Sequence, residues 1–187
     1  MINLGSEEAW ELLKAWVLVT LAFFILLGEP FSAAGFGLVA VAVGGAVVFH
    51  ELGHKYVAER YGHVARFVAN DAMLIIGVFM AFTGFIFIAP GAVHVRGLHD
   101  ARQNALVAWA GPAVNAALAF AAYMMTGFGV AQGYFALILR VNALLGAFNM
   151  LPVPGFDGEK IWAGSKTLYG GTVVVLGFLV AAGFVAV

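Results

Sequence analysis

Long apolar segments separated by short polar stretches run through the whole chain. A helix needs roughly 20 mostly apolar residues to cross a bilayer. Five segments are close to that length and composition: 9–28, 34–61, 105–128, 133–151 and 168–187. The pattern predicts an all-α polytopic membrane protein with five to six transmembrane helices.

A sixth apolar segment, residues 73–93, is harder to assign. Four residues that weaken a helix interrupt it: Gly77, Gly84, Pro90 and Gly91. Such breaks are tolerated at membrane depth only where surrounding protein or a wet cavity satisfies the backbone. The segment either crosses as a sixth helix or enters and returns on one side. The second alternative is a re-entrant element at about 67–95, with a β-hairpin as one form.

The basic residues favour the re-entrant alternative. If residues 73–93 return to the side they entered from, six basic residues share one face: Arg60, Arg66, Arg96, Arg102, Lys160 and Lys166. If the segment crosses, they divide between the two faces. Lys and Arg concentrate on the cytoplasmic side of membrane proteins. The sequence therefore predicts five true spans, with this basic face in the cytoplasm.

The overall composition supports a membrane protein and excludes several function classes. The 187 residues are 63% hydrophobic and 10% charged, whereas a soluble domain carries about 25% charged residues. The net charge of −1 offers nothing to nucleic acid, and the absence of cysteine excludes disulfide and thiolate chemistry. No repeat or linker divides the sequence. We expect one membrane-embedded domain over 1–187, surrounded by the lipid bilayer, and no feature indicates an oligomeric state.

One stretch of the second apolar segment carries an unusual group of ionisable residues. The sequence HELGH places His50 and His54 one turn apart on the same face of a helix, where both imidazoles can reach one zinc ion. Glu51 lies about 100° around the helix and can act on a water at the metal as general base. Each ionisable group costs about 2.5–3.5 kcal/mol in a membrane, so a shared metal is favoured over chance.

Lys55 and Tyr56 follow this motif directly. We interpret them as the interfacial end of the helix, where a lysine extends to water and a tyrosine lies at headgroup depth. This interpretation places the metal about one turn below the cytoplasmic surface.

A catalytic zinc usually has three protein ligands, and Asp157 in NMLPVPGFDG is the best candidate for the third. The prolines and glycines of this stretch unwind the chain, and a carboxylate in such a place at membrane depth is functional by default. With five spans, His50 and Asp157 also approach the same face. The alternative is an acid in an Asp-Gly turn at the interface.

The motifs HELGH, AGPAVN and NMLPVPGFDG, in this order over a core of residues 34–162, resemble the site-2 protease family of intramembrane zinc metalloproteases. The resemblance is to a minimal form without PDZ or CBS domains. It implies His50, His54 and Asp157 as zinc ligands and Glu51 as the catalytic acid and base. It also implies that 73–93 is re-entrant and β-like and binds substrate. Phe156 departs from the residues that usually precede the aspartate.

Two asparagines belong to the motifs that carry the resemblance. Asn149 matches the family residue that helps to hold substrate or the oxyanion, and Gly111, Pro112 and Asn115 match a Gly-Pro-x-x-Asn motif. Either asparagine could instead hydrogen-bond a neighbouring helix. For Asn115 we favour this structural role, and for Asn149 both roles stay open.

The sequence therefore predicts an intramembrane zinc metalloprotease that cleaves peptide bonds in or near transmembrane segments of other membrane proteins. The alternative is a transporter or channel that binds metal without chemistry, although such a site has no need for Glu51. An aspartyl protease lacks a second well-placed carboxylate, and a serine protease lacks a serine in a suitable context. A prenyl-protein-type zinc protease would use a later glutamate, for which only Glu159 is available.

Overall fold

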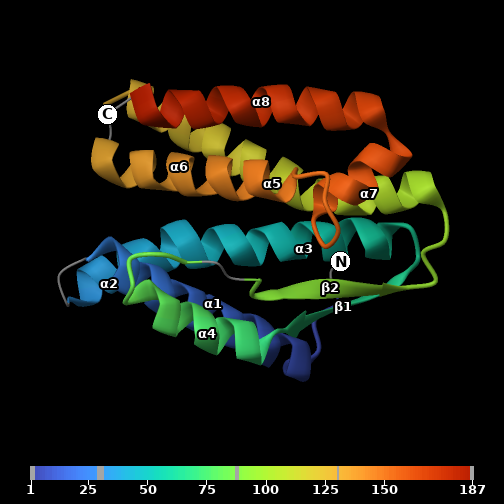
Figure 1. The fold of residues 1–187 in the computed structure, drawn as a ribbon, viewed down its shortest axis with the longest axis horizontal. Helices are drawn as coiled ribbons and strands as arrows, with labels where there is room; N and C mark the ends of the chain where they lie inside the picture. The colour runs from blue at the N-terminus through green and yellow to red at the C-terminus, as the bar shows by residue number, and fades with distance from the viewer. Residues whose placement is uncertain (1–2, 29–31, 87–88, 130, 186–187) are drawn as a thin grey trace.

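Four long apolar helices build most of the protein. The computed structural model describes residues 3–28, 32–86, 89–129 and 131–185. Four described helices are long and apolar enough to cross a membrane. They are α1 (Ser6–Leu27), the continuous helix Ala33–Arg60, α5 (Ala101–Gly127) and α8 (Lys166–Val185). The second consists of α2 (Ala33–Val39), the π-helical turn η1 (Ala40–Gly44) and α3 (Gly45–Arg60). An all-α polytopic membrane fold is thus confirmed (Figure 1).

The helix α6 (Gln132–Asn149) coincides with the fourth expected span but is not among the four helices that are long and apolar enough to cross a membrane. It packs against both α5 and α8. Arg140, in its middle, donates from Nε to the carbonyl oxygen of Gly183 at 2.7 Å, and Asn142 is buried. Four described helices, rather than five, therefore meet the length and composition of a span, and the polar side chains of Arg140 and Asn142 on α6 find partners inside the protein.

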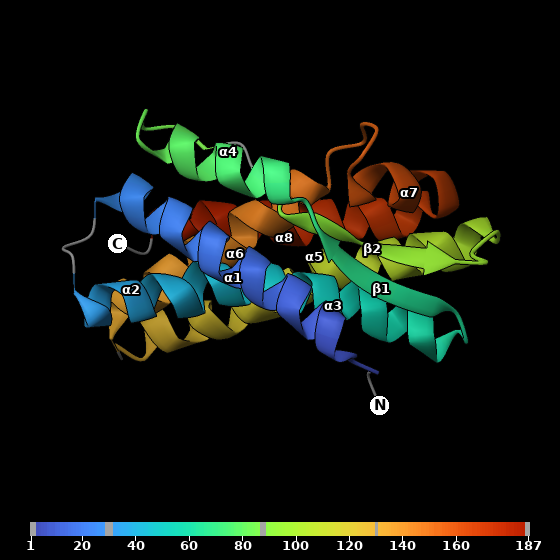
Figure 2. The ribbon, with the colours of Figure 1, turned by 90° about the horizontal axis from the view of Figure 1, so that it is seen from below.

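The re-entrant segment enters and leaves at the same end of the molecule. Strands β1 (Val64–Ala69) and β2 (Gly91–Arg96) pair antiparallel, with Ala69 opposite Gly91. Between them, α4 (Asp71–Ala81) runs alongside α1 (Figure 2). An 11-residue helix is about 16 Å long, about half of a bilayer core of roughly 30 Å. The expected return of the segment and a pairing of its flanks as β-strands are confirmed, but the expectation that residues 73–93 are themselves β-like is wrong for their first half, which is the helix α4.

The first helix closes the outer edge of β1. Glu8 Oε1 accepts a hydrogen bond from the Phe67 backbone N–H at 2.8 Å, and Glu11 Oε2 accepts from the Ala69 N–H at 3.1 Å. Lys55 Nζ donates to the Ala65 carbonyl oxygen at 2.6 Å. An edge strand exposes unpaired backbone groups to which another strand can add. On β1 these groups are occupied by side chains of α1 and α3.

The expectation that Lys55 extends to water at the interface is wrong. Lys55 is buried, and its Nζ lies 3.0 Å from Glu8 Oε2 and 2.8 Å from Glu59 Oε1. The acidic first turn of α1 and strand β1 cover this end of α3, so the lysine meets two carboxylates instead of solvent. Tyr56, on the same turn, is 48% exposed, and its position at headgroup depth stays a prediction.

Most of the basic residues of the chain gather at one end of the helix bundle. This end holds the sheet, the short helix α7 (Asp157–Gly164) and the adjoining ends of α3, α5 and α8 (Figure 1). These elements carry the six residues whose common face was predicted: Arg60, Arg66, Arg96, Arg102, Lys160 and Lys166. The fold thus has a basic end and an opposite end, at which α5 ends and α6 begins.

Candidate metal centre

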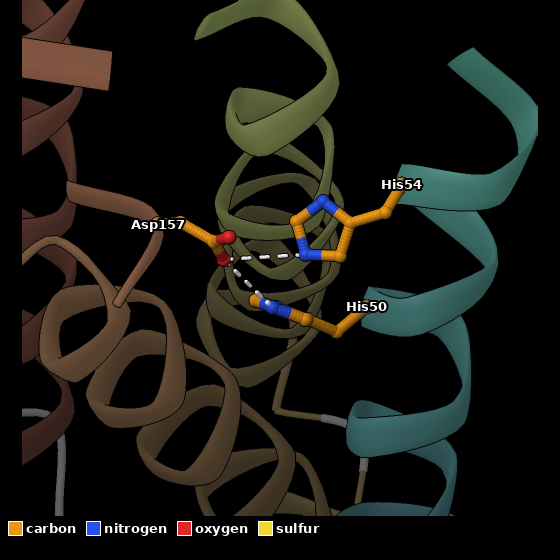
Figure 3. A group of neighbouring side chains, drawn as sticks. All are labelled: His50, His54 and Asp157. Carbon is orange, nitrogen blue, oxygen red and sulfur yellow. Dashed lines mark hydrogen bonds and ion pairs between the residues drawn. The ribbon is translucent and has the colours of Figure 1, made fainter. Parts of the chain in front are cut away.

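Two histidines and one aspartate from different elements converge inside the bundle. His50 and His54 lie one turn apart on α3, and Asp157 is the first residue of α7. The Nε2 atoms of both histidines lie 3.2 Å from Asp157 Oδ2 (Figure 3). All three residues are buried. The residues predicted as a metal-binding group from spacing and depth are thus brought together.

Hydrogen bonds on the far side of each imidazole determine which ring nitrogen faces the aspartate. His54 Nδ1 lies 2.8 Å from the carbonyl oxygen of Val107 on α5. His50 Nδ1 lies 2.5 Å from Oδ1 of Asn115, about two helix turns further along α5. A carbonyl oxygen can only accept a hydrogen bond, so each Nδ1 carries the proton. Each Nε2 then presents a lone pair toward Asp157, as in histidines that bind metals.

Three electron-pair donors therefore face one another with no proton between them. One ligand atom from each residue can be chosen so that all lie within 4.8 Å of one another. Two imidazole lone pairs and a carboxylate repel in the absence of a cation, and burial makes this repulsion costly. Two imidazoles, one carboxylate and an open position form a common catalytic zinc site. The residues present thus fit a zinc ion.

The protonation of Asp157 suits the same role. Burial raises the pKa of this carboxyl, but the two imidazoles beside it lower the pKa by more, so the net direction is down. A metal ligand must be deprotonated. Asp157 is therefore an anion at neutral pH, available as a ligand.

The glycine of the Gly-Pro-x-x-Asn motif leaves the space in which the three ligands meet. A methyl group on Gly111 would overlap Nε2 of His54 and lie 2.6 Å from Nε2 of His50. On the facing helix, a methyl group on Gly53 would lie 2.9 Å from the carbonyl oxygen of Ala110. The two glycines therefore let α3 and α5 approach closely enough for the imidazoles to lie against the α5 backbone. Pro112 also lies within α5 and has no N–H for the helix ladder.

A cavity of about 240 Å³ adjoins the three residues. Glu51 and Asn149, the two predicted catalytic residues, line it together with residues of β2, α5 and α7. Glu51 is buried at 8% exposure. Asn149 uses its Nδ2 to donate to the Leu145 carbonyl oxygen on its own helix at 3.0 Å. Both residues thus line the same cavity as the three candidate ligands, and their catalytic roles stay predictions.

The three remaining histidines of the chain and Glu159 lie outside this group. His63 pairs with Gln103 Oε1 at 3.0 Å, while His94, His99 and Glu159 are exposed. Among the residues that the structure describes, His50, His54 and Asp157 form the one cluster of three such side chains able to hold an ion. The third ligand expected at Asp157 therefore needs no substitute.

Two features of the site were not predicted. The contact of His54 with the Val107 carbonyl could not be predicted, because every residue type has a backbone carbonyl. Asn115 was expected to hydrogen-bond a neighbouring helix, and it does, donating from Nδ2 to the Ala46 carbonyl oxygen at 3.3 Å. Its contact with a predicted ligand was not foreseen, although a fully buried amide in an apolar helix indicates that a partner exists.

We expect Gly111→Ala to abolish stoichiometric zinc binding, because the added methyl group occupies the space between the two Nε2 atoms. Metal analysis of the purified variant measures this directly. Gly177→Ala is the matched control, since nothing lies within 4 Å of a methyl group at that position of α8. Equal zinc content in the two variants would show that the ligands do not meet beside Gly111.

Comparison with known proteins identifies relatives over most of the chain. "Putative zinc metalloprotease MJ0611" of Methanocaldococcus jannaschii is 37% identical over 159 residues, which cover 81% of this chain and 82% of the relative. "Putative zinc metalloprotease Rip2" of Mycobacterium tuberculosis is 34% identical over 70% of this chain and 58% of its own length. "Putative zinc metalloprotease YwhC" of Bacillus subtilis is 30% identical over 60% of this chain and 61% of its own.

No protein-family model matches the sequence, and no solved structure matches it. The identity to the Methanocaldococcus jannaschii relative nevertheless extends over most of both chains. Together with the buried histidine–aspartate group, this similarity shows that the chain belongs to the site-2 protease family of zinc metalloproteases.

Proposed function

We propose that this metalloprotease hydrolyses peptide bonds in or near the transmembrane segments of other membrane proteins, with His50, His54 and Asp157 as its zinc ligands. The observation that carries the proposal is the depth of the metal group. His50 precedes the end of α3 at Arg60 by ten residues, or about 15 Å along the helix. A peptide bond must enter the helix bundle to reach this group, which favours a membrane-embedded substrate.

The residues around the cavity can divide the steps of hydrolysis. A zinc ion held by His50, His54 and Asp157 would supply Lewis-acid chemistry, which polarises a carbonyl and lowers the pKa of a water toward about 7. Glu51 lines the same cavity as the three ligands. We assign it the removal of a proton from the attacking water and its return to the leaving amine. We assign Asn149, which lines the cavity as well, a hydrogen bond from its second amide hydrogen to the developing oxyanion.

A transporter or channel is the less favoured reading of the same site. The relatives named as zinc metalloproteases speak for hydrolysis. The position of Glu51 does so as well, since a binding site without chemistry has no need of a buried acid beside its ligands.

We further propose that the substrate binds in extended form along β2. A helical substrate keeps its carbonyl groups hydrogen-bonded and shielded, so it must unwind before hydrolysis. The outer edge of β1 is occupied by Glu8, Glu11 and Lys55. Because inward and outward backbone groups alternate along an antiparallel strand, the register turns the backbone groups of Val93 and Val95 to the outer edge of β2, where the backbone of Val93 already hydrogen-bonds Glu51. Both residues line the metal cavity, so an added strand would pass beside Glu51.

The active site is proposed to open toward the cytoplasm. The six basic residues of the basic end lie near α7 and the sheet, which flank the cavity. Because basic residues concentrate on the cytoplasmic side, this end should face the cytoplasm.

The role of Glu51 is tested by Glu51→Gln. The amide cannot accept the proton of the attacking water, so we expect cleavage of a membrane-protein substrate in detergent to fall by at least about 100-fold, with zinc content unchanged. Glu159→Gln is the matched control, an exposed acid on α7 whose replacement should leave cleavage at the wild-type rate. Cleavage by Glu51→Gln at that rate would remove Glu51 from the mechanism.

Substrate binding on β2 is tested by Val95→Pro. Proline removes one outward-facing N–H but leaves the β1 pairing intact, because edge strands tolerate proline at such positions. We expect a raised KM for a transmembrane substrate and unchanged zinc content. Val95→Ala shortens the side chain to a similar extent but keeps the N–H, and should cleave nearly normally. A similar KM for both variants would argue against strand addition here.

The orientation is tested with single cysteines, because the chain has none of its own. Lys166→Cys lies at the basic end and Gly133→Cys at the opposite end, and both positions are exposed. A membrane-impermeant maleimide applied to intact cells should label Gly133→Cys, and should label Lys166→Cys only after permeabilisation. The reverse pattern would place the active site on the other side.

A further inference from the structure

We infer that Asn142 on α6 is a positioning residue for the metal centre, acting through Asn115 to fix the orientation of His50. This inference concerns how the metal is held and does not depend on which substrate is cleaved. Asn142 belongs to none of the three sequence motifs. Asn142 lies in the middle of an apolar helix, and only 2% of its surface is exposed.

A chain of hydrogen bonds connects Asn142 to the metal group. Asn142 Nδ2 lies 2.9 Å from the Ile138 carbonyl oxygen on its own helix, and its Oδ1 lies 3.0 Å from Asn115 Nδ2. Asn115, which is fully buried, in turn faces His50 Nδ1 with its Oδ1. The chain thus runs from α6 through α5 to α3.

The direction of these bonds follows from their fixed ends. The Ile138 carbonyl can only accept, so the amide nitrogen of Asn142 faces it and its oxygen faces Asn115. The Ala46 carbonyl also can only accept, which turns the amide nitrogen of Asn115 toward it at 3.3 Å. Both constraints leave the oxygen of Asn115 for His50. His50 must therefore donate from Nδ1 and present Nε2 to Asp157.

Asn142 provides the shorter of the two contacts that hold the Asn115 amide, at 3.0 Å against 3.3 Å for Ala46. Without it, Asn115 could rotate and offer its NH₂ group to His50, which would favour the wrong nitrogen as ligand. His54 has a backbone carbonyl as its partner and needs no such support. The side-chain relay therefore serves the histidine for which α5 offers only a rotatable amide.

Asn142→Leu removes both hydrogen bonds at similar volume. We expect zinc affinity, measured by competition with a chelator, to fall about tenfold or more, the usual effect of losing a hydrogen-bonded partner behind a ligand. Leu139→Ala is the control, a buried residue on the same helix away from the relay. It should lower thermal stability but leave zinc affinity at the wild-type value. Wild-type zinc affinity in Asn142→Leu would overturn the inference.

The double variant Asn115→Leu/Asn142→Leu tests whether Asn142 acts through Asn115. Its zinc affinity should match that of Asn115→Leu within about twofold, because contacts in one network do not add. If the loss of zinc affinity in the double variant equals the product of the losses in the two single variants, the relay is overturned.

If Asn142→Leu fails to fold, Asn142→Ala serves as the second variant. Nitrogen NMR of the zinc-loaded wild type is independent of both variants. It should show His50 protonated at Nδ1 and metal-bound at Nε2, and metal-bound Nδ1 would overturn the inference.

Discussion

The mutual repulsion of two imidazole lone pairs and a carboxylate, deep inside a membrane helix bundle, is the constraint on which this structure depends. His50, His54 and Asp157 could not share one small buried space as unprotonated groups without a cation. With a zinc ion between them, the same geometry becomes favourable. Helix spacing on α3 and the start of α7 both serve to bring these three groups to one point.

Much of the remaining fold holds His50, His54 and Asp157 in this arrangement. Gly53 and Gly111 let α3 and α5 approach, so that the imidazoles reach acceptors on α5. On the other side, the acids of α1 and the buried Lys55 hold β1, and with it the paired strand β2, beside the cavity. The metal group and the proposed substrate strand are therefore fixed by separate sets of contacts that meet at Glu51.

The sequence predicted the elements whose signals are local. The helix bounds follow from apolar length, and the convergence of His50, His54 and Asp157 follows from spacing and depth. The fate of Lys55 could not be predicted, because its partner Glu8 lies 47 positions away and covers it only once α1 packs against the sheet. The role of Asn142 could not be predicted either. A buried amide implies a partner, but the chain of contacts to His50 passes through a third helix.

The coordination of the metal tests this account most directly. X-ray absorption at the zinc edge of the purified protein reports the ligand types and distances. The account predicts about one zinc per chain, with two imidazole nitrogens at about 2.0–2.1 Å and a carboxylate oxygen at about 2.0–2.2 Å. In Asp157→Ala the carboxylate contribution should vanish and the zinc content should fall. A wild-type protein without bound zinc, or an unchanged spectrum in Asp157→Ala, would contradict it.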